Sequence, residues 1–183
     1  MSVVGEVELD DATLVARSRD GDMRAYEQLV RRYQRPMYRL AVRIVRSSGD
    51  AEDVVQDVFL TAWRRLVQLN DDDAFVSWLY RTTTNACLNI LRKRKPQADA
   101  ELDEQESAAP RPEHAAEVSA QLDALQVALG DLTPEQRACW VLREVHGRSY
   151  DEIAEAIGTT QQSVRGRLAR ARAQLAEVMA PWR

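Results

Sequence analysis

Glutamine and arginine side chains near the C-terminus recur at a spacing that suits the recognition of duplex DNA. An apolar stripe at helical spacing would bury one side of a helix here, and it consists of Val164, Leu168, Ala171 and Leu175. At about 100° per residue, the opposite side carries Gln162, Arg165, Gly166, Ala169 and Arg170. The edges of the stripe carry Arg167 and Arg172. Because guanidinium forks bind guanine edges and flanking cations bind phosphates, this spacing predicts a helix that enters a DNA major groove.

Two capping signals and one glycine predict the helix-turn-helix that would position this face. Ser149 with Glu152, and Thr159 with Gln162, have the spacing of capping boxes, which satisfy N–H groups left unpaired at a helix start. Gly158 between them supplies the left-handed residue that ends the first helix. The segment 149–172 therefore predicts two short helices joined by a tight turn.

A second polar stripe lies on the helix predicted for residues 75–95. It contains Trp78, Thr82, Asn85, Asn89 and Arg92, and it is followed by Lys93, Arg94 and Lys95. An aromatic surface, amides and cations in line are what single-stranded DNA binding requires. The alternative places Trp78 in the core and the amides in water, with the basic run favouring the helix C-terminus.

Carboxylates surround one leucine on the helix predicted for residues 49–66. Its buried side would contain Val54, Val55, Val58, Phe59, Ala62 and Leu66. The other side carries Asp50, Asp53, Gln56, Asp57, Leu60 and Arg64. Either this is a solvated face with one exposed leucine, or it is a docking face whose apolar anchor and carboxylates meet a basic partner.

Composition and motifs give no support for an exported protein or an enzyme. The 183 residues are 45% hydrophobic and 30% charged, which is ordinary for a soluble chain of one or two domains. No apolar run approaches a membrane span, and the N-terminus is acidic rather than basic and then apolar, so we expect a cytoplasmic protein without membrane insertion. Cys87 and Cys139 lie in apolar helical contexts without a metal motif, which predicts buried thiols. We expect no metal, no cofactor and no catalytic residue.

The near absence of β-branched alternation predicts an all-α protein of two small helical domains joined by a flexible acidic linker. We expect a disordered N-terminus over residues 1–10, a first domain over 11–95, a linker over 96–117 and a second domain over 118–183. Helices are expected at 11–19, 22–45, 49–66, 75–95, 119–129 and 133–145, followed by the helix-turn-helix. Pro36 should kink or divide the second helix, and Thr133, Pro134 and Gln136 predict a third capping box.

The net charge of −4 is concentrated in the linker. Residues 96–117 hold seven acidic residues and one basic residue, whereas residues 1–95 hold 16 basic and 14 acidic residues and residues 118–183 hold eight of each. Because salt screens charges over about 8 to 10 Å, basic patches in the domains can act independently of the linker.

Three motifs occur together and in order: DAEDVVQDVFLTAW at 50–63, FVSWLYRTTTNACLNILRKRK at 75–95, and LTPEQRACWVLREVHGRSYDEIAEAIGTTQQSVRGRLARARAQL at 132–175. With them the chain resembles the bacterial extracytoplasmic-function sigma factors, group 4 of the sigma-70 family, over about residues 11–176. The resemblance implies a two-domain initiation subunit that binds core RNA polymerase and directs it to particular promoters, without catalytic activity of its own. It also implies polymerase contacts at the β′ clamp coiled coil and the β flap, and it leaves control by an anti-sigma factor, by regulated expression or by proteolysis as alternatives.

The resemblance assigns a role to each motif. The first would be region 2.2, which docks on the β′ clamp coiled coil, with Asp53, Gln56 and Asp57 as polar contacts and Leu60 as apolar support. The second would be regions 2.3 and 2.4, which melt the minus-ten element and bind it as a single strand. Asn85 matches an asparagine that helps to capture a flipped base, and residues 67–74 match the loop that forms the base pocket. Position 89 is often aspartate in this family and is asparagine here, which leaves the fine base preference open.

The third motif would be region 4, whose recognition helix binds the minus-thirty-five element as duplex. Arg165, Gly166, Ala169 and Arg170 occupy its usual base-facing positions. Small residues at 166 and 169 leave few side chains to specify bases, so DNA shape would supply part of the selectivity. The acidic linker matches the region that threads the polymerase near the active-site cleft, although a plain tether explains its composition equally well.

The alternative function is that of a stand-alone helix-turn-helix regulator whose first lobe dimerises or senses a signal. Such a protein would bind palindromic duplex without polymerase, because a dimer requires half-sites in register.

Overall fold

The computed structural model describes residues 9–69, 71–94, 124–178 and 180. The predicted linker, Lys95 and nearly all of the N-terminal segment 1–10 lie outside the described residues. All regular structure in the described part is helical, which confirms the all-α prediction.

The first lobe consists of α1 (Asp11–Arg19), α2 (Met23–Val45), α3 (Ser48–Arg65) and α4 (Phe75–Arg94). Two short 3-10 turns, η1 (Leu66–Gln68) and η2 (Asp72–Ala74), connect α3 to α4. Carboxylate or hydroxyl side chains of Asp10, Asp22 and Ser47 accept hydrogen bonds from the first turns of α1, α2 and α3, so each start is set by a local cap.

Pro36 lies inside α2, which continues through it as one helix, so of the two predicted effects, a kink or a division, the division does not occur. Proline removes one backbone donor, but the turn after it is fixed by burial. Met37, Leu40 and Ala41 are all fully buried there against the other helices of the lobe. Tertiary packing therefore offsets the lost hydrogen bond.

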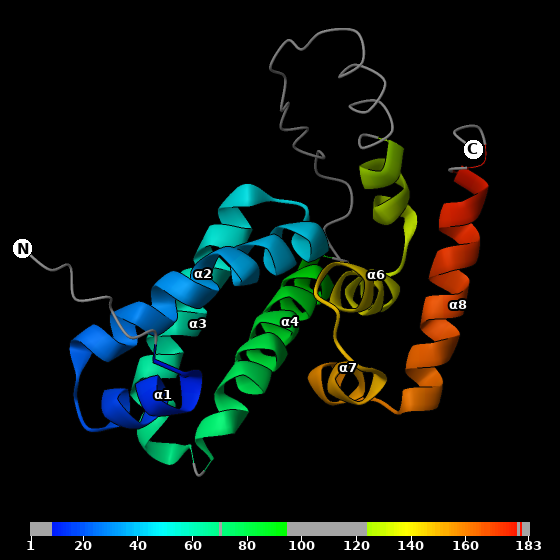
Figure 1. Cartoon of the computed structure of the whole chain (residues 1–183). Helices are drawn as coiled ribbons and strands as arrows, with labels where there is room; N and C mark the ends of the chain where they lie inside the picture. Colours follow the sequence, from blue (N-terminus) through cyan, green and yellow to red (C-terminus); the bar gives the residue numbers. More distant parts are fainter. Residues whose placement is uncertain (1–8, 70, 95–123, 179, 181–183) are drawn as a thin grey trace, which may run out of the picture.

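The second lobe contains a helical segment at 124–131, then α6 (Pro134–Trp140), a π-helical turn η4 (Val141–Val145), α7 (Tyr150–Ile157) and α8 (Gln161–Val178). The capping boxes predicted at Thr133 and Ser149 are both present, and Gly158 ends α7 in the left-handed conformation with φ of 72°. The predicted buried stripe of α8 is confirmed at all four positions. Figure 1 shows α8 running past the ends of α6 and α7.

The capping box predicted at Thr159 with Gln162 is wrong by one residue. The Thr160 hydroxyl, not that of Thr159, accepts from the third helical residue, Ser163, at 3.2 Å. The Thr159 N–H is already used by α7, because it donates to the Ala154 carbonyl at 2.9 Å. This bond closes a Schellman-type end, so α8 can begin only after the next residue.

The two lobes share one continuous hydrophobic core instead of standing apart. The buried cluster runs from Leu14 and Leu29 in the first lobe to Leu142, Ile153 and Leu168 in the second. In Figure 1, α7 lies alongside α4, and these two helices are in contact. The arrangement brings the second lobe next to the helix that carries the predicted single-strand stripe.

Candidate nucleic-acid and polymerase interfaces

The outer face of α8 presents the side chains that the sequence assigned to DNA. Gln162, Arg165, Ala169 and Arg170 are exposed, and Gly166 is half-buried. A Cβ added at Gly166 would lie 3.5 Å from a guanidinium nitrogen of Arg170, so Arg170 folds over the glycine one turn before it. That distance is an ordinary van der Waals contact, so the guanidinium packs directly beside the helix backbone at the glycine.

Tyr150 at the start of α7 holds two arginines near this face. The Arg165 guanidinium lies 5.7 Å from the Tyr150 ring centroid, and the Arg143 guanidinium lies 5.1 Å from it. Arg165 also donates to the Gln161 side chain over a long 3.4 Å contact. Such contacts are weak enough to be exchanged for a base edge when DNA arrives.

Arg167 and Arg172 flank the buried stripe as predicted, but each has a partner inside the protein. Arg167 is half-buried beside Cys139, and burial raises the pKa of that thiol to about 11 although Arg167 opposes the shift. Arg172 donates to a Glu144 carboxylate oxygen at 2.7 Å. Their DNA role remains a prediction. Arg165 and Arg170 are exposed and, among the described residues, form no ion pair.

The stripe on α4 is accessible along most of its length. Trp78, Thr82 and Asn85 are half-buried, and Asn89, Arg92, Lys93 and Arg94 are exposed. One part of the Trp78 side chain packs against the core, as one of the two alternatives predicted. The remaining part is accessible, as stacking on a base would require. Arg92 donates to the Asn89 side chain at 3.1 Å, and Arg94 pairs with Asp50 of α3.

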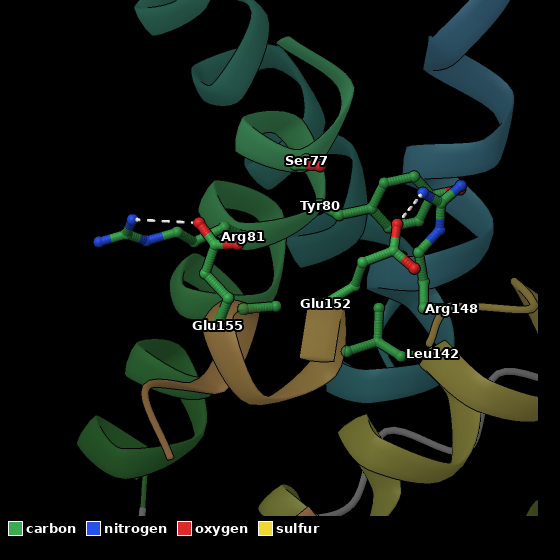
Figure 2. A pocket seen from close by; sticks show the side chains of 8 residues that line it. Ser77, Tyr80, Arg81, Leu142, Arg148, Glu152 and Glu155 are labelled. Atoms are coloured by element: carbon green, nitrogen blue, oxygen red, sulfur yellow. Dashed lines mark hydrogen bonds and ion pairs between the residues drawn. The ribbon is translucent and has the colours of Figure 1, made fainter. Parts of the chain in front are cut away.

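The face of α4 next to this stripe is covered by the second lobe. Figure 2 shows the small pocket at this contact, lined by Ser77, Tyr80, Arg81, Leu142, Arg148, Glu152, Glu155 and Ala156. Arg81 of α4 and Glu155 of α7 form an exposed ion pair at 3.9 Å on one side of the pocket. On the other side, Arg148 lies 4.0 Å over the Tyr80 ring and pairs with Glu152 at 3.0 Å.

A histidine completes this contact between the lobes. The Tyr80 hydroxyl lies 3.2 Å from His146 Nδ1, and the two rings meet edge to face. Burial, together with the positive charges of Arg43, Arg148 and Arg39, lowers the pKa of His146 to about 4. The imidazole is therefore neutral at neutral pH, and its Nδ1 can accept a hydrogen bond from the Tyr80 hydroxyl.

Sequence reasoning missed Arg137, which joins the lobes from α6. It is only 6% exposed, and its guanidinium donates to the Ile44 carbonyl at the end of α2 at 2.7 Å. It also donates to the carbonyls of Leu129, Gly130 and Leu132 within its own lobe. Burial lowers its pKa to about 10, so it remains charged at neutral pH. Arg137 lies only one turn after the N-cap Thr133, at a position that carries no spacing signal for such a role.

The predicted docking face on α3 is open. All four of its residues are exposed: Asp53, Gln56, Asp57 and Leu60. The Leu60 side chain is 48% exposed. Asp53 and Asp57 pair with no cation within the described part of the chain. Carboxylates without an internal partner and an exposed leucine leave this face available to a basic protein surface.

The connection between α3 and α4, which precedes the α4 stripe, is held from α1. Arg19 donates to the carbonyls of Leu66 and Leu69 and pairs with the Asp72 carboxylate. Val67 at its tip is 73% exposed. The turns predicted to border a captured base are therefore anchored while their outer surface is accessible.

The remaining sequence predictions concern thiols, metals and membranes. Cys87 and Cys139 are both buried as predicted, and burial raises the pKa of Cys87 to about 12. Among the residues that the structure describes, no group of three or more histidine, cysteine or carboxylate side chains is placed to hold a metal ion. None of the described helices combines the length and the apolar character needed to cross a membrane.

A helix-turn-helix beside a second polar helix is typical of a DNA-binding protein, and the family comparisons identify the class. Residues 29–97 match the family Sigma-70 region 2, and residues 122–175 match Sigma-70, region 4. The chain belongs to the extracytoplasmic-function sigma factors of the sigma-70 family. It is a promoter-directing subunit of RNA polymerase.

Named relatives cover almost the whole chain. The sequence is 39% identical to the ECF RNA polymerase sigma factor SigM of Mycobacterium tuberculosis, over 96% of this chain and 87% of that protein. It is 36% identical to the ECF RNA polymerase sigma-E factor of Escherichia coli K12, over 90% of this chain and 92% of that protein.

Two solved structures share the fold. CnrH in complex with the cytosolic domain of CnrY matches with a TM-score of 0.71 and 30% identity, over 93% of this chain and 97% of that chain. The sigma factor RpoE in complex with the anti-sigma factor NepR from Bartonella quintana matches with a TM-score of 0.67 and 26% identity, over 85% of this chain and 96% of that chain.

Proposed function

We propose that this sigma factor binds core RNA polymerase through α3 and recognises its promoters with α4 and α8. The observation that carries the proposal is the presence of two DNA-type faces on one chain, beside an open carboxylate and leucine face. A stand-alone regulator would use α8 but would have no need of the faces on α3 and α4.

The α4 stripe binds the minus-ten element as a single strand. Flipping a base out of the stack costs a few kcal/mol, and stacking and hydrogen bonds between the protein and the base edge must offset this cost. Asn85 supplies an amide for a base edge, and Trp78 supplies a ring that is only partly used by the core. The exposed cations Arg92, Lys93 and Arg94 neutralise phosphates at the end of the helix.

The outer face of α8 binds the minus-thirty-five element in the major groove, and its lobe contacts the β flap. Arg165 and Arg170 carry most of the base recognition, because they are exposed and held only by weak contacts. The small residues Gly166 and Ala169 allow the helix to approach the groove closely, which lets DNA shape add to selectivity.

The rest of the assignment follows from this role. The first domain spans residues 11–95 and the second spans residues 118–183, and the acidic segment 96–117 joins them. The protein acts in the cytoplasm, where polymerase and promoters are found, and adds no catalytic step of its own. Because relatives of the same fold were solved with CnrY and with the anti-sigma factor NepR, we propose that an anti-sigma factor controls this chain too.

Reconstitution with core polymerase tests the proposal. The purified chain and core enzyme are combined with genomic DNA, and the start sites of chain-dependent transcripts are mapped. We expect discrete start sites, each preceded by common sequence elements near positions −10 and −35. The proposal would be refuted if the chain formed no stable complex with core enzyme, or if the transcripts had no common upstream sequence.

A charge reversal tests the docking face separately. Asp53→Arg places a cation where the proposal requires a carboxylate, so we expect a loss of core affinity of about tenfold or more with an unchanged fold. Glu52→Arg is the matched control, because it makes the same charge change on the neighbouring exposed residue of α3. Equal affinities for both variants and the wild type would refute the docking role.

A further inference from the structure

The connection between α3 and α4 depends on one side chain that belongs to neither helix. Arg19, the last residue of α1, donates from Nε to the Leu66 carbonyl at 3.3 Å and from Nη2 to the Leu69 carbonyl at 2.9 Å. The same nitrogen Nη2 pairs with the carboxylate of Asp72. A single guanidinium thereby ties η1 to η2, as the position of α1 beside this end of the bundle in Figure 1 makes possible.

Local bonds alone hold these two turns weakly. Leu69 N–H donates to the Leu66 carbonyl within η1, and Ala74 N–H donates to the Asp71 carbonyl around η2. Each bond closes one turn, and neither fixes η1 relative to η2. The Arg19 side chain supplies that relation, because its planar fork keeps the directions of its donors fixed.

The contact serves the turns more than it serves the attachment of α1. Leu14 and Val15 are fully buried in the core, and Tyr33 and Arg32 of α2 bind Asp11 at the start of the same helix. Loss of the Arg19 bonds would therefore leave α1 in place. The Arg19 side chain is 29% exposed, so this contact lies at the surface of the molecule, at the turns that precede α4.

We propose that Arg19 is a positioning residue that sets the geometry of η1 and η2 and, through them, the base preference at the minus-ten element. This inference rests on the proposed function, in which these turns border the captured base. Arg19 touches no base itself. It acts by holding the carbonyls and the carboxylate of the turns in one arrangement, which a well-defined base pocket requires.

The test uses holoenzyme made from the full chain and core polymerase. Binding is measured to fluorescent single-stranded oligonucleotides that carry the minus-ten element with each of the four bases at the captured position. The readout is the ratio of the affinities for the preferred and the disfavoured bases. The variant is Arg19→Gln, and the matched control is Arg17→Gln, which removes an exposed arginine of α1 whose partner is Asp22.

We expect Arg19→Gln to reduce the ratio by about fivefold, the change that corresponds to losing about one neutral hydrogen bond, while core affinity stays at the wild-type value. Arg17→Gln should retain the ratio. Asp72→Asn tests the same contact from the loop side, and its effect should not add to that of Arg19→Gln, because residues in one network are coupled. This variant also keeps the test available if Arg19→Gln folds poorly.

Each outcome bears on one of the two proposals. An unchanged ratio in Arg19→Gln and Asp72→Asn, or an equal loss of affinity for all four bases, would overturn the positioning role. A wild-type holoenzyme that does not distinguish the four bases would instead contradict the proposed function of the α4 face.

Discussion

Arg137 shows how much can depend on one side chain that no motif singles out. Its guanidinium satisfies the Ile44, Leu129, Gly130 and Leu132 carbonyls, which belong to segments far apart in the chain. Carbonyls at helix ends and in turns have no partner of their own, so a buried arginine that serves four of them joins the lobes and closes the loop before α6.

Replacing Arg137 should destabilise the protein strongly. Arg137→Met keeps the bulk of the side chain but leaves buried carbonyls without a donor, and we expect a loss of about 3 kcal/mol in the free energy of unfolding. Urea unfolding followed by circular dichroism measures the change. The control is Arg170→Ala, an exposed substitution expected to stay within about 0.5 kcal/mol of wild type. Similar midpoints for the two variants would contradict the structural role of Arg137.

His146 should make the stability depend on acidity. Its folded pKa of about 4 lies below the ordinary value of 6.5, because burial and the nearby arginines disfavour the charged ring. The unfolded state therefore binds a proton more readily, so the stability from this group is complete above about pH 6.5 and is lost as the pH falls toward 4. With allowance for partial exposure, the loss is about 2 kcal/mol.

Glutamine at this position isolates the effect from the titration of carboxylates. His146→Gln keeps a polar side chain beside Tyr80 but cannot be protonated. The stability difference between wild type and variant is measured by urea unfolding at pH 7.5 and pH 4.5. We expect the wild type to lose more stability than the variant between the two conditions, and parallel losses would show that His146 titrates normally in the folded state.

At the scale of elements, most of the helices could be predicted because their signals are local. The bounds of α1 agree with the prediction at both ends, and the capping boxes at Thr133 and Ser149 are formed. Errors occurred where neighbouring elements compete for the same group. The helix expected over 133–145 changes to a π-helical turn at Val141, where His146 N–H donates to the Val141 carbonyl five residues back. The position of His146 against Tyr80 depends on a contact between distant segments, and hydrophobic periodicity carries no information about such a contact.

The start of α8 gives a sharp test of such competition. Thr160→Ala removes the hydroxyl that accepts from Ser163 N–H, and it should cost about 1 kcal/mol of stability. Thr159→Ala removes only a side chain whose backbone N–H ends α7, so we expect a change below about 0.5 kcal/mol. Thermal unfolding of the two single variants distinguishes them. A larger loss for Thr159→Ala would restore the capping box expected from the sequence.

The candidate site could be predicted as separate faces but not as an assembly. Stripes on α3, α4 and α8 follow from helical spacing, and the exposed positions of Leu60, Asn89 and Arg165 agree with it. The contact between the lobes could not be found in this way, because Tyr80, Arg137 and Arg148 look like ordinary helix residues and loop residues until the lobes are brought together. Long-range packing of this kind has no fixed sequence spacing.

At the scale of the whole molecule, the contact between the lobes has a geometric consequence for promoter binding. Elements centred near positions −10 and −35 are separated by about 25 base pairs, or about 85 Å of duplex at 3.4 Å per pair. The lobes that would bind them share one core in this structure. The chain from Arg94 to residue 124 can reach about 100 Å when extended. The linker is therefore long enough for both sites to be occupied, but only after the lobes part.

We therefore expect the lobes to separate when the promoter complex forms. Cysteines replacing Glu27 on α2 and Glu177 on α8, both exposed, carry a donor and an acceptor dye for energy transfer. The native thiols Cys87 and Cys139 are buried with raised pKa, which keeps them unreactive toward labelling. Transfer should be higher in the free protein than in its complex with core polymerase and a promoter. A variant that weakens the contact, Glu155→Arg, replaces the partner of Arg81 with a like charge and should lower the transfer already in the free chain. Because Arg81 and Glu155 are both exposed, screening makes this second effect smaller and dependent on salt. Unchanged transfer in a complex that still produces the specific transcript would mean that the two elements are not bound by the two lobes at once.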